Sequence, residues 1–527
     1  MTQPPPVPAT TLYRDGRVRA PQHPVATALL VRGGAIAWVG HDPDHLVADV
    51  AHEADEVVDL AGGLVTAAFV DAHVHATSTG LALTGLDLTG SASLADCLRQ
   101  VEDAGRRARG GVVLGHGWDE TTWPEHRAPT RQELDRASYG GVVYLSRIDV
   151  HSAVVSSALL AAVPEVRGQD GWSESGHLTR EAHHVVRREA RESITPAQRE
   201  VLQRATRERA ATLGVGLLHE LSGPDIAGAD DLTAFLALSA AEPGPEAVGY
   251  WGEAASLGGV ARARELGALG AAGDLFADGS IGSHTACLRD PYTDAPHAGH
   301  GYLDAAAVRD HVVACTEAGL QAGFHAIGDG ALDAVVAGYA EAGEQLGADR
   351  LRAARHRIEH VEMVAPEHLP VLARLGVVAS VQPAFDRLWG GETGMYAERL
   401  GLPRALSLNP YAAMAAAGIA LALGSDSPVT PIDPWGSVRA AVRHRTPGSG
   451  LDLVAAFDAH TRGGWWAARR DADGVVATGA PATFAVWDVD ELDPATGLPR
   501  LEAADAAPRC RRTVVRGTTV FDRDASG

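Results

Sequence analysis

The alternation of short β-type runs with longer helix-forming stretches constrains the fold of this chain more than any other feature. The runs are apolar, and the stretches between them are rich in Ala, Arg and Glu. Eight such runs occupy residues 64–70, 215–219, 247–250, 274–277, 320–325, 357–360, 377–381 and 419–423. Parallel strands need long crossover connections, which are usually helices, so this rhythm predicts an α/β fold with a (β/α)8 TIM barrel.

Both ends of the chain have a different texture, with strand-like runs separated by turn residues. Residues 28–31 and 35–39 flank a Gly-Gly pair, which is typical of a β-hairpin. Residues 483–487 and 512–517 repeat the pattern near the C-terminus. We therefore expect a small β-sandwich that is assembled from both termini. The predicted boundaries are residues 1–63 and 475–527 for the β-sandwich and residues 64–474 for the barrel.

The gap between the first two predicted barrel strands is too long for one crossover helix. It contains two more apolar runs, at residues 112–114 and 142–145. Connections in α/β units usually add only a few residues to a single helix. We therefore expect an inserted subdomain at about residues 76–210.

Charge and cysteine content narrow the classes of partner and compartment. The formal net charge is −22, which argues against nucleic acid and anionic membranes, because both attract clusters of basic residues. The Pro-rich start lacks a signal-peptide pattern, and no apolar run approaches the roughly 18 residues of a membrane span. The four cysteines lie far apart, as expected for reduced thiols. These features predict a cytoplasmic protein and leave its oligomeric state open.

A pair of histidines, His73 and His75, directly follows the first predicted strand. Alternate residues of a strand point to the same side, so both imidazoles should face the C-terminal mouth of the barrel, where barrel enzymes keep their active sites. Three later strands end in further metal-competent residues, His325, His360 and Asp426. A ring of imidazole and carboxylate ligands predicts a divalent metal, most simply Zn²⁺, with Fe²⁺ or Mn²⁺ as alternatives.

Longer motifs extend this pattern along the chain. They lie at residues 69–75 (FVDAHVH), 115–119 (GHGWD), 129–135 (PTRQELD), 276–283 (FADGSIGS), 325–329 (HAIGD), 357–360 (RIEH), 382–383 (QP) and 424–429 (GSDSPV). With these motifs in this order, the chain resembles the amidohydrolase superfamily, and within it the amidohydrolase-3 branch that includes N-substituted formamide deformylase-like proteins. The resemblance covers nearly the whole chain.

The resemblance implies a metal-dependent hydrolase that acts on non-peptide amide-type carbon–nitrogen bonds of small molecules. In such an enzyme a metal-activated hydroxide attacks the amide carbon, and Asp426 acts both near the metal and as general base. Coordination lowers the pKa of water from about 15.7 to about 7, and a nearby carboxylate can take its proton and later deliver it to the leaving nitrogen. His360 is the second catalytic candidate, because it could bind a second metal or polarise the scissile carbonyl.

One position departs from the branch in a way that affects the metal. Relatives commonly carry a lysine on strand 4 that becomes carbamylated and bridges two metals, whereas this chain has Asp274 there and no lysine anywhere. An aspartate is several bonds shorter, so we expect it not to span the same gap. The predicted centre therefore holds one ion on His73, His75, His325 and Asp426, with His360 free to contact substrate.

Five residues are candidates for substrate binding. They are Trp118, His151, Asp278, His284 and Gln382. Trp118 could line the pocket from the inserted subdomain or pack in a core, and His151 could face the pocket or lie on the surface. His284 stands where relatives usually carry arginine.

Two other functions stay open at this point. A nucleobase-type deaminase could use the same barrel, but such enzymes usually place glutamate three residues after the strand-5 histidine, where this chain has Gly328. A catalytically silent binding or regulatory homologue would not need the complete ring of metal-competent residues. The sequence favours amide hydrolysis.

Overall fold

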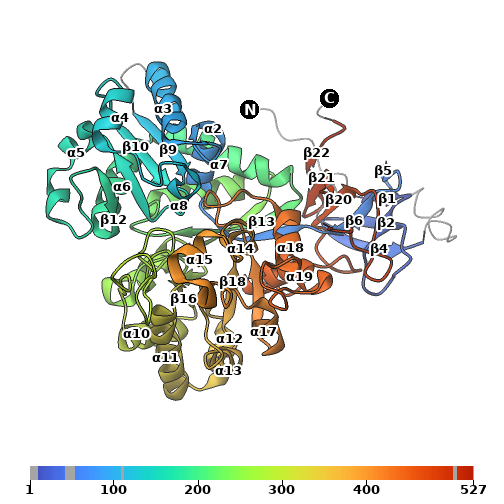
Figure 1. Cartoon of the computed structure of the whole chain (residues 1–527). Coiled ribbons are helices and arrows are strands. Elements are labelled where there is room, and N and C mark those ends of the chain that lie inside the picture. Colours follow the sequence, from blue (N-terminus) through green and yellow to red (C-terminus); the bar gives the residue numbers. More distant parts are fainter. Residues whose placement is uncertain (1–9, 42–53, 109–111, 503–506, 526–527) are drawn as a thin grey trace.

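The computed structural model describes residues 10–41, 54–108, 112–502 and 507–525 (Figure 1). Residues 1–9 of the Pro-rich start and part of the predicted domain 1–63 lie outside the described residues. A central barrel lies between a part formed by the inserted segment and a part formed by strands from both ends of the chain.

Eight parallel strands form the central sheet, and they neighbour one another in sequence order. They are β7 (Phe69–Val74), β13 (Val215–Ser222), β14 (Glu246–Trp251), β15 (Gly270–Ala271), β16 (Gln321–Ala326), β17 (Arg357–His360), β18 (Val378–Val381) and β19 (Ala420–Leu423). A parallel bridge between Val74 and Ser427, just after β19, brings the last strand back to the first. The sheet is thus a nearly closed barrel, and the predicted fold class is confirmed.

Two of the predicted barrel strands are wrong in position. The run at residues 64–70 is two strands, because β6 (Leu64–Ala67) pairs with a C-terminal strand and β7 begins after the single residue Ala68. Every residue of both strands is buried, so hydrophobicity alone could not separate them. The run at residues 274–277 follows the actual fourth strand, β15, whose two small residues give no β-type signal.

Helices cover the outside of the barrel (Figure 1). They are α8 (Ala229–Ala241), η3 (Ala255–Leu257), α9 (Gly259–Glu265), α10 (Ala305–Glu317), α11 (Asp329–Leu346), α12 (Ala348–Ala354), α13 (Leu369–Leu375), α14 (Pro383–Trp389), α15 (Met395–Leu400), α16 (Leu402–Ala405), α17 (Tyr411–Ala416), α18 (Pro434–Val442), α19 (Leu453–His460) and α20 (Arg462–Ala467). Asp304 caps α10 by accepting from the N–H of Ala307, and the buried side chains of this helix recur three or four residues apart. Within the described residues, no helix combines the length and the apolar character that crossing a membrane requires.

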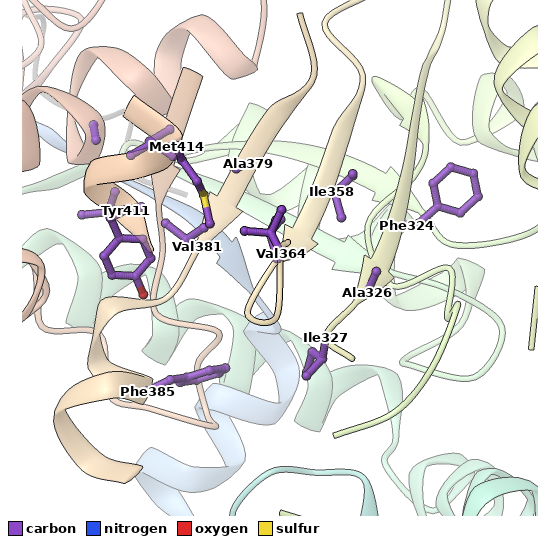
Figure 2. Packing of buried hydrophobic residues seen from close by; sticks show 14 of the residues in the cluster. Phe324, Ala326, Ile327, Ile358, Val364, Ala379, Val381, Phe385, Tyr411 and Met414 are labelled. Carbon is purple, nitrogen blue, oxygen red and sulfur yellow. The ribbon is translucent and has the colours of Figure 1, made fainter. Parts of the chain in front are cut away.

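One large apolar cluster holds the barrel strands against the surrounding helices. Phe324 and Ile358 from the strands belong to it together with Phe385, Tyr411 and Met414 from the helices (Figure 2). Each fully buried side chain of this kind contributes roughly 1.5–3 kcal/mol. The barrel therefore has an apolar core that does not depend on its polar mouth.

Strands from both chain ends form two sheets beside the barrel (Figure 1). One sheet contains β1 (Thr10–Arg14), β3 (Ala28–Arg32), β4 (Ala35–Gly40) and β5 (Glu56–Asp59), and the other contains β2 (Arg17–Val18), β6, β20 (Phe484–Asp488), β21 (Arg509–Val515) and β22 (Thr518–Asp522). Strands β3 and β4 form the predicted hairpin, and its turn residues Gly33 and Gly34 have φ values of 57° and 82°, which favour glycine. Ile36, Val65 and Phe484 belong to one apolar cluster, so the two termini share a core.

The segment between β7 and β13 has a sheet of its own. It contains α2 (Ala76–Thr84), β8 (Leu86–Asp87), α3 (Leu94–Ala108), β9 (Val113–Trp118), η1 (Glu120–Thr122), α4 (Arg131–Ala137), β10 (Val143–Arg147), β11 (Ser152–Val155), α5 (Ser157–Ala162), η2 (Pro164–Gly168), β12 (His177–Thr179), α6 (Arg180–Glu192) and α7 (Pro196–Ala211). Helix α2 packs closely on α7, because a Cβ at Gly80 would lie only 2.2 Å from the carbonyl oxygen of Leu202. This packing joins the two ends of the segment, and the N–H of Ala76 at the start of α2 donates to Glu220 on β13 at 2.8 Å.

Candidate metal centre

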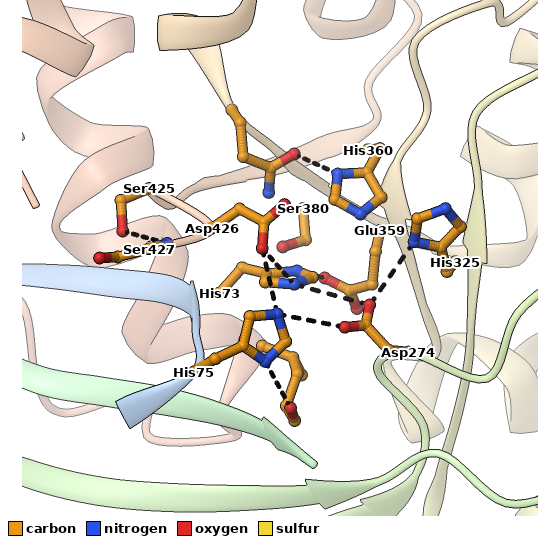
Figure 3. A network of polar contacts seen from close by, with 12 residues as sticks. His73, His75, Asp274, His325, Glu359, His360, Ser380, Ser425, Asp426 and Ser427 are labelled. Atoms are coloured by element: carbon orange, nitrogen blue, oxygen red, sulfur yellow. Dashed lines mark hydrogen bonds and ion pairs between the residues drawn. The ribbon is translucent and has the colours of Figure 1, made fainter. Parts of the chain in front are cut away.

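The two histidines of the first motif lie at the C-terminal end of β7, and both are buried (Figure 3). Nδ1 of His73 lies 3.0 Å from Oε2 of Glu359, and Nδ1 of His75 lies 2.9 Å from the carbonyl oxygen of Leu221. An oxygen acceptor at Nδ1 places a proton there. Nε2 of each ring is therefore the atom that faces the centre, as is usual for histidine ligands with a supporting acceptor.

Asp426 lies in the loop after β19 and faces both rings. Its Oδ1 is 3.2 Å from Nε2 of His73 and 3.1 Å from Nε2 of His75. Its backbone N–H donates to the carbonyl oxygen of His73 at 2.8 Å, which ties the loop to β7. The φ of Asp426 is 55°, a left-handed value that costs a non-glycine residue on the order of 1–3 kcal/mol. The fold thus holds this carboxylate in place against a conformational cost.

Asp274 approaches the same two histidines from the end of β15. Its Oδ2 is 3.3 Å from Nε2 of His75, and its Oδ1 is 3.6 Å from both Nε2 of His73 and Nδ1 of His325. Figure 3 shows this carboxylate between His75 on one side and His325 on the other. Asp274 therefore contacts histidines on both sides of the centre, and its place as a bridge between two metals stays an open prediction.

The reach of Asp274 comes from its backbone. Gly273, directly before it, has a φ of 87°, which turns the chain in a way that favours glycine. A Cβ at Gly252 would lie 2.7 Å from the carbonyl group of Asp274, so a glycine there lets the backbone come close. Because the backbone turns at Gly273 and comes close to Gly252, the short side chain of Asp274 contacts histidines on both sides of the centre.

His325 and His360 extend from β16 and β17, with their ring centroids 4.4 Å apart. Nδ1 of His360 lies 2.8 Å from Oε1 of Gln382, so its Nε2 carries the lone pair. Nε2 of His325 lies 3.2 Å from the carbonyl oxygen of Gly279, and its Nδ1 faces Asp274. The imidazole of His360 is thus held by Gln382, whereas that of His325 is held between Gly279 and Asp274.

The five predicted metal residues and Asp274 lie together, but their donor atoms are not equivalent. Among the described residues, two sets of three donors lie within 4.8 Å of one another, and both contain His73. One set adds His75 and Asp426, and the other adds Asp274 and His360. His325 belongs to neither set.

The electrostatics of the centre suit a bound cation. Burial raises the pKa of Asp426 and of Asp274, but the surrounding histidines, His73 foremost, together offset this effect and hold both carboxyl pKa values well below their usual range. Burial alone would lower the pKa of His73, yet the same two carboxylates raise it well above its usual value. A metal at Nε2 of His73 therefore takes the place of a proton, which couples metal binding to pH.

Three buried atoms at the centre make no hydrogen bond within the described part of the chain. They are Nε2 of His73, Oδ1 of Asp274 and Oδ1 of Asp426. A buried polar atom without a hydrogen bond costs about 1–3 kcal/mol, and a cation bound to all three would remove that cost. One nitrogen and two carboxylate donors suit Zn²⁺, Fe²⁺ or Mn²⁺. The residues present fit a divalent metal.

A second layer of charged residues supports this ring, and the sequence analysis did not assign it a role. Glu359 is fully buried with Arg357, and 2.9 Å separates its Oε2 from Nη2 of the arginine. Asp71 accepts hydrogen bonds from the N–H and the hydroxyl of Ser425 at 2.8 and 2.6 Å, which joins β7 to the loop of Asp426. The alternation along β17 is a sequence signal for this pair, because it places Arg357 and Glu359 on the same face of a fully buried strand, where charged residues are rare unless they are paired.

Two of the five predicted substrate-binding residues lie at the centre. His151 lines a cavity that also reaches Asp426 and His360, and its ring centroid is 5.0 Å from that of His325. Gln382 contacts His360 and orients its ring.

The other three predicted substrate-binding residues are engaged elsewhere. Asp278 is fully buried, and its carboxylate accepts hydrogen bonds from the backbone N–H groups of Cys287, Ile327 and Gly328. Trp118 packs in the core of the inserted segment and donates to the carbonyl oxygen of Leu145. His284 pairs with Asp294, with 2.9 Å between Nε2 and Oδ1. The structure gives these residues contacts within the protein scaffold.

Known proteins resemble the chain over most of its length. The protein LONG AFTER FAR-RED 3 of Arabidopsis thaliana is 29% identical over 459 residues, covering 80% of this chain and 76% of that protein. The N-substituted formamide deformylase of Arthrobacter pascens is 24% identical, covering 95% of this chain and 96% of its own. The solved structure of an uncharacterised metal-dependent hydrolase from Pyrococcus furiosus has a TM-score of 0.70 and 26% identity, covering 91% of this chain and 99% of that one.

A family model also matches the chain over most of its length. The model of the amidohydrolase family matches residues 56–521, which include every strand of the barrel and every residue of the candidate metal centre. The chain therefore belongs to the amidohydrolase family and is a hydrolytic enzyme.

Proposed function

We propose that this enzyme hydrolyses an amide-type carbon–nitrogen bond of a small molecule with one divalent ion, most simply Zn²⁺. His73, His75 and Asp426 would hold the ion, together with an oxygen of Asp274. The observation that carries the proposal is the set of buried donor atoms without hydrogen bonds at this centre. A relative named N-substituted formamide deformylase, which aligns along almost the whole chain, supports an amide-type substrate.

The shared histidine supports one ion per chain. Both donor sets contain His73, whose Nδ1 is engaged by Glu359, so only Nε2 can bind a metal. One nitrogen binds one ion, and two dications a few ångströms apart would repel strongly in a site poorly screened by water. The absence of lysine excludes a carbamate bridge. Asp274 then acts as a further ligand, and the predicted ligand His325 contacts Asp274 in place of the ion.

A bound divalent ion lowers the pKa of water from about 15.7 to about 7 and so makes hydroxide available at neutral pH. Asp426 is the base in this proposal. It is buried, charged and fixed by its backbone hydrogen bond to His73, so it can accept the proton that the attacking water releases. The same carboxyl then delivers that proton to the leaving nitrogen.

The role of His360 differs from the sequence-based expectation. Burial, reinforced by the neighbouring His325, lowers the pKa of His360 to about 3, so the ring is neutral at neutral pH. Its one proton faces Gln382, and its Nε2 presents a lone pair to the cavity. A carbonyl oxygen is polarised by a hydrogen-bond donor or a cation, and the Nε2 lone pair of His360 is neither. His360 instead accepts a hydrogen bond, from the attacking water or from the N–H of the substrate.

Position 328 counts against the deaminase alternative, because its surroundings leave no room for the glutamate that such enzymes usually carry there. A Cβ there would lie 2.1 Å from the carbonyl oxygen of Cys287, so no glutamate fits without a shift of the backbone. The hydrolysis of an amide does not need a side chain at this position.

A cytoplasmic location is also part of the proposal. All four cysteines are free, and burial raises the pKa of the Cys97, Cys315 and Cys510 thiols to about 12. Buried thiols of this kind suit a reducing compartment, where they stay protonated and unpaired.

A hydrolysis screen tests the proposed function. Protein stripped of metal is loaded with Zn²⁺, Mn²⁺ or Fe²⁺ and offered N-formyl, N-acyl and cyclic amides, with nucleobases as the deaminase control. We expect amide turnover that depends on added metal and is lost in His75→Ala. Deamination of a nucleobase with no turnover of any amide would replace the proposal with its alternative.

A further inference from the structure

Two arginines of the inserted segment face the candidate metal centre. Arg187 and Arg191 lie four residues apart on α6, so they share one face of that helix. Both line the cavity that reaches Asp426 and His360. The intervening Arg188 faces outward, with 53% of its side chain exposed, and pairs with Asp225.

Neither inward guanidinium is paired with a carboxylate among the described residues. Arg187 is 4% exposed and donates to the carbonyl oxygens of Val150 and Asp225, but its buried Nε has no partner. Arg191 donates to the hydroxyl of Ser78 at 3.2 Å, and its buried Nη1 has no partner. Burial lowers the pKa of Arg191 to about 10, so it is still charged at neutral pH.

Other buried arginines of this chain are held either by carboxylates or, as at Arg207, by three backbone carbonyl oxygens. Arg147, which is buried like Arg187, is paired with three carboxylates, and Arg357 is paired with Glu359. A buried charge without a counter-ion is costly, so buried arginines normally have acidic partners. The chain has 67 acidic residues and a net charge of −22, yet it leaves two cations at its cavity without one. This pattern points to an anion that comes from outside the protein.

The cavity continues beyond the arginines into an apolar pocket. A second cavity shares Ser78, Arg187 and Arg191 with the first. Leu81 and Leu114 line this second cavity and not the first. The two arginines therefore lie where the cavity of the metal centre adjoins a second cavity that has aliphatic side chains in its lining.

We infer that the substrate carries a carboxylate, which Arg191 binds with the help of Arg187, and that its class is an N-acyl amino acid with an apolar side chain. The inference rests on the proposed function, because the arginines would orient an amide whose scissile carbon lies at the metal centre. The planar guanidinium suits a carboxylate, which it binds through parallel hydrogen bonds. The apolar side chain would occupy the pocket lined by Leu81 and Leu114.

The kinetic test compares two substrates that differ only in the carboxylate. They are N-acetyl-leucine and N-(3-methylbutyl)acetamide, with metal-loaded enzyme in both cases. The wild type should prefer the anion by at least 10-fold in kcat/KM. In Arg191→Gln this ratio should fall roughly 10- to 100-fold, the range for a hydrogen-bonded charged group. Arg188→Gln, on the outer face of the same helix, is the matched control and should keep the wild-type ratio.

A binding test separates this inference from the proposed function. Calorimetry measures the affinity of the metal-loaded protein for the ketone analogue of N-acetyl-leucine in which CH₂ replaces N–H, because this analogue cannot be hydrolysed. Arg191→Gln should bind it 10- to 100-fold more weakly than the wild type and Arg188→Gln. Binding of this kind without turnover of any amide would keep the anion site and remove the amidase function.

The opposite pattern overturns the inference. If amides are hydrolysed but Arg191→Gln changes neither the ratio nor the affinity, the arginines do not bind substrate. Should Arg191→Gln fail to fold, the wild type decides alone, and equal kcat/KM values for the anionic and neutral substrates would refute the carboxylate requirement.

Discussion

His73, His75 and His360 each engage a protein acceptor through Nδ1, so Nε2 of each ring faces the cavity. At His73 the carboxylates of Asp274 and Asp426 attract either a proton or a metal ion to that nitrogen. Only one of the two can occupy it, so a metal must displace the proton. The acceptors behind the three rings, which are Glu359, the carbonyl oxygen of Leu221 and Gln382, thus decide which nitrogen of each ring faces the cavity.

The first prediction at this scale concerns the base. Asp426→Asn keeps an oxygen near His73 and His75 but removes the carboxylate that accepts a proton. We expect kcat to fall roughly 100-fold or more, the usual scale for losing acid–base catalysis. The control is Asp290→Asn, at an exposed position. Turnover near the wild-type value in a folded, metal-loaded Asp426→Asn protein would exclude Asp426 from the mechanism.

The second prediction concerns a ligand. His75→Ala should abolish both metal retention and activity, because it removes one of the nitrogens that face Asp426. The fold should survive, since the barrel core is apolar and does not include this ring. Elemental analysis and far-UV circular dichroism provide the two readouts, with the partly exposed His284→Ala as control. Full metal content in His75→Ala would show that the ion is bound elsewhere.

At the scale of elements, a buried histidine joins three parts of the barrel wall. Nδ1 of His356, just before β17, accepts from the N–H of Ala322 on β16 at 2.8 Å, and Nε2 lies 2.9 Å from the hydroxyl of Thr316 on α10. Protonation of Nδ1 would oppose the first bond. Burial, with a smaller contribution from nearby Arg469, accordingly lowers the pKa of His356 from 6.5 to about 3.

This geometry predicts a loss of stability in acid. Between pH 6.5 and about 3 the unfolded chain binds a proton at His356 that the folded chain does not, so stability falls as the pH falls. At pH 5 the contribution is about 2 kcal/mol. His356→Gln should therefore destabilise the protein less at pH 5 than at pH 7, relative to the wild type, in urea unfolding. The control is the exposed His300→Gln. An equal penalty at both values of pH would contradict the prediction.

The strands and turns that could be predicted from the sequence are those that a pattern of neighbouring residues determines. The barrel rhythm and the Gly33-Gly34 hairpin follow from the spacing of apolar and turn residues, and the five predicted metal residues follow from their places near strand ends. The break at Ala68 was not predictable, because it depends on which sheet each strand joins. The reach of Asp274 depends on the backbone at Gly252 and Gly273, and the pairing of Glu359 with His73 joins residues 286 positions apart.

The number of metal ions that one chain retains is a property of the whole protein that can be measured directly. We expect a ratio near one metal per chain after saturation and gel filtration, because the two donor sets share His73. Asp274→Asn should keep that stoichiometry with weaker retention. A ratio near two in the wild type and near one in Asp274→Asn would identify Asp274 as a bridge between two ions. Elemental analysis of both proteins decides between these accounts.

The junction at Ala68 has a consequence for the order in which the enzyme is made. Strand β6 pairs with β2 along one edge and with β20 along the other, where Ala67 pairs with Phe484, so the strand just before β7 completes its pairing only with the last tenth of the chain. Ribosomes add roughly 5–20 residues per second, which makes the wait on the order of 20–80 s. Throughout that time the nascent chain exposes an unpaired apolar edge next to its future metal ligands. Completion of the sheet and maturation of the centre therefore belong to the end of synthesis, after the C-terminal strands have left the ribosome.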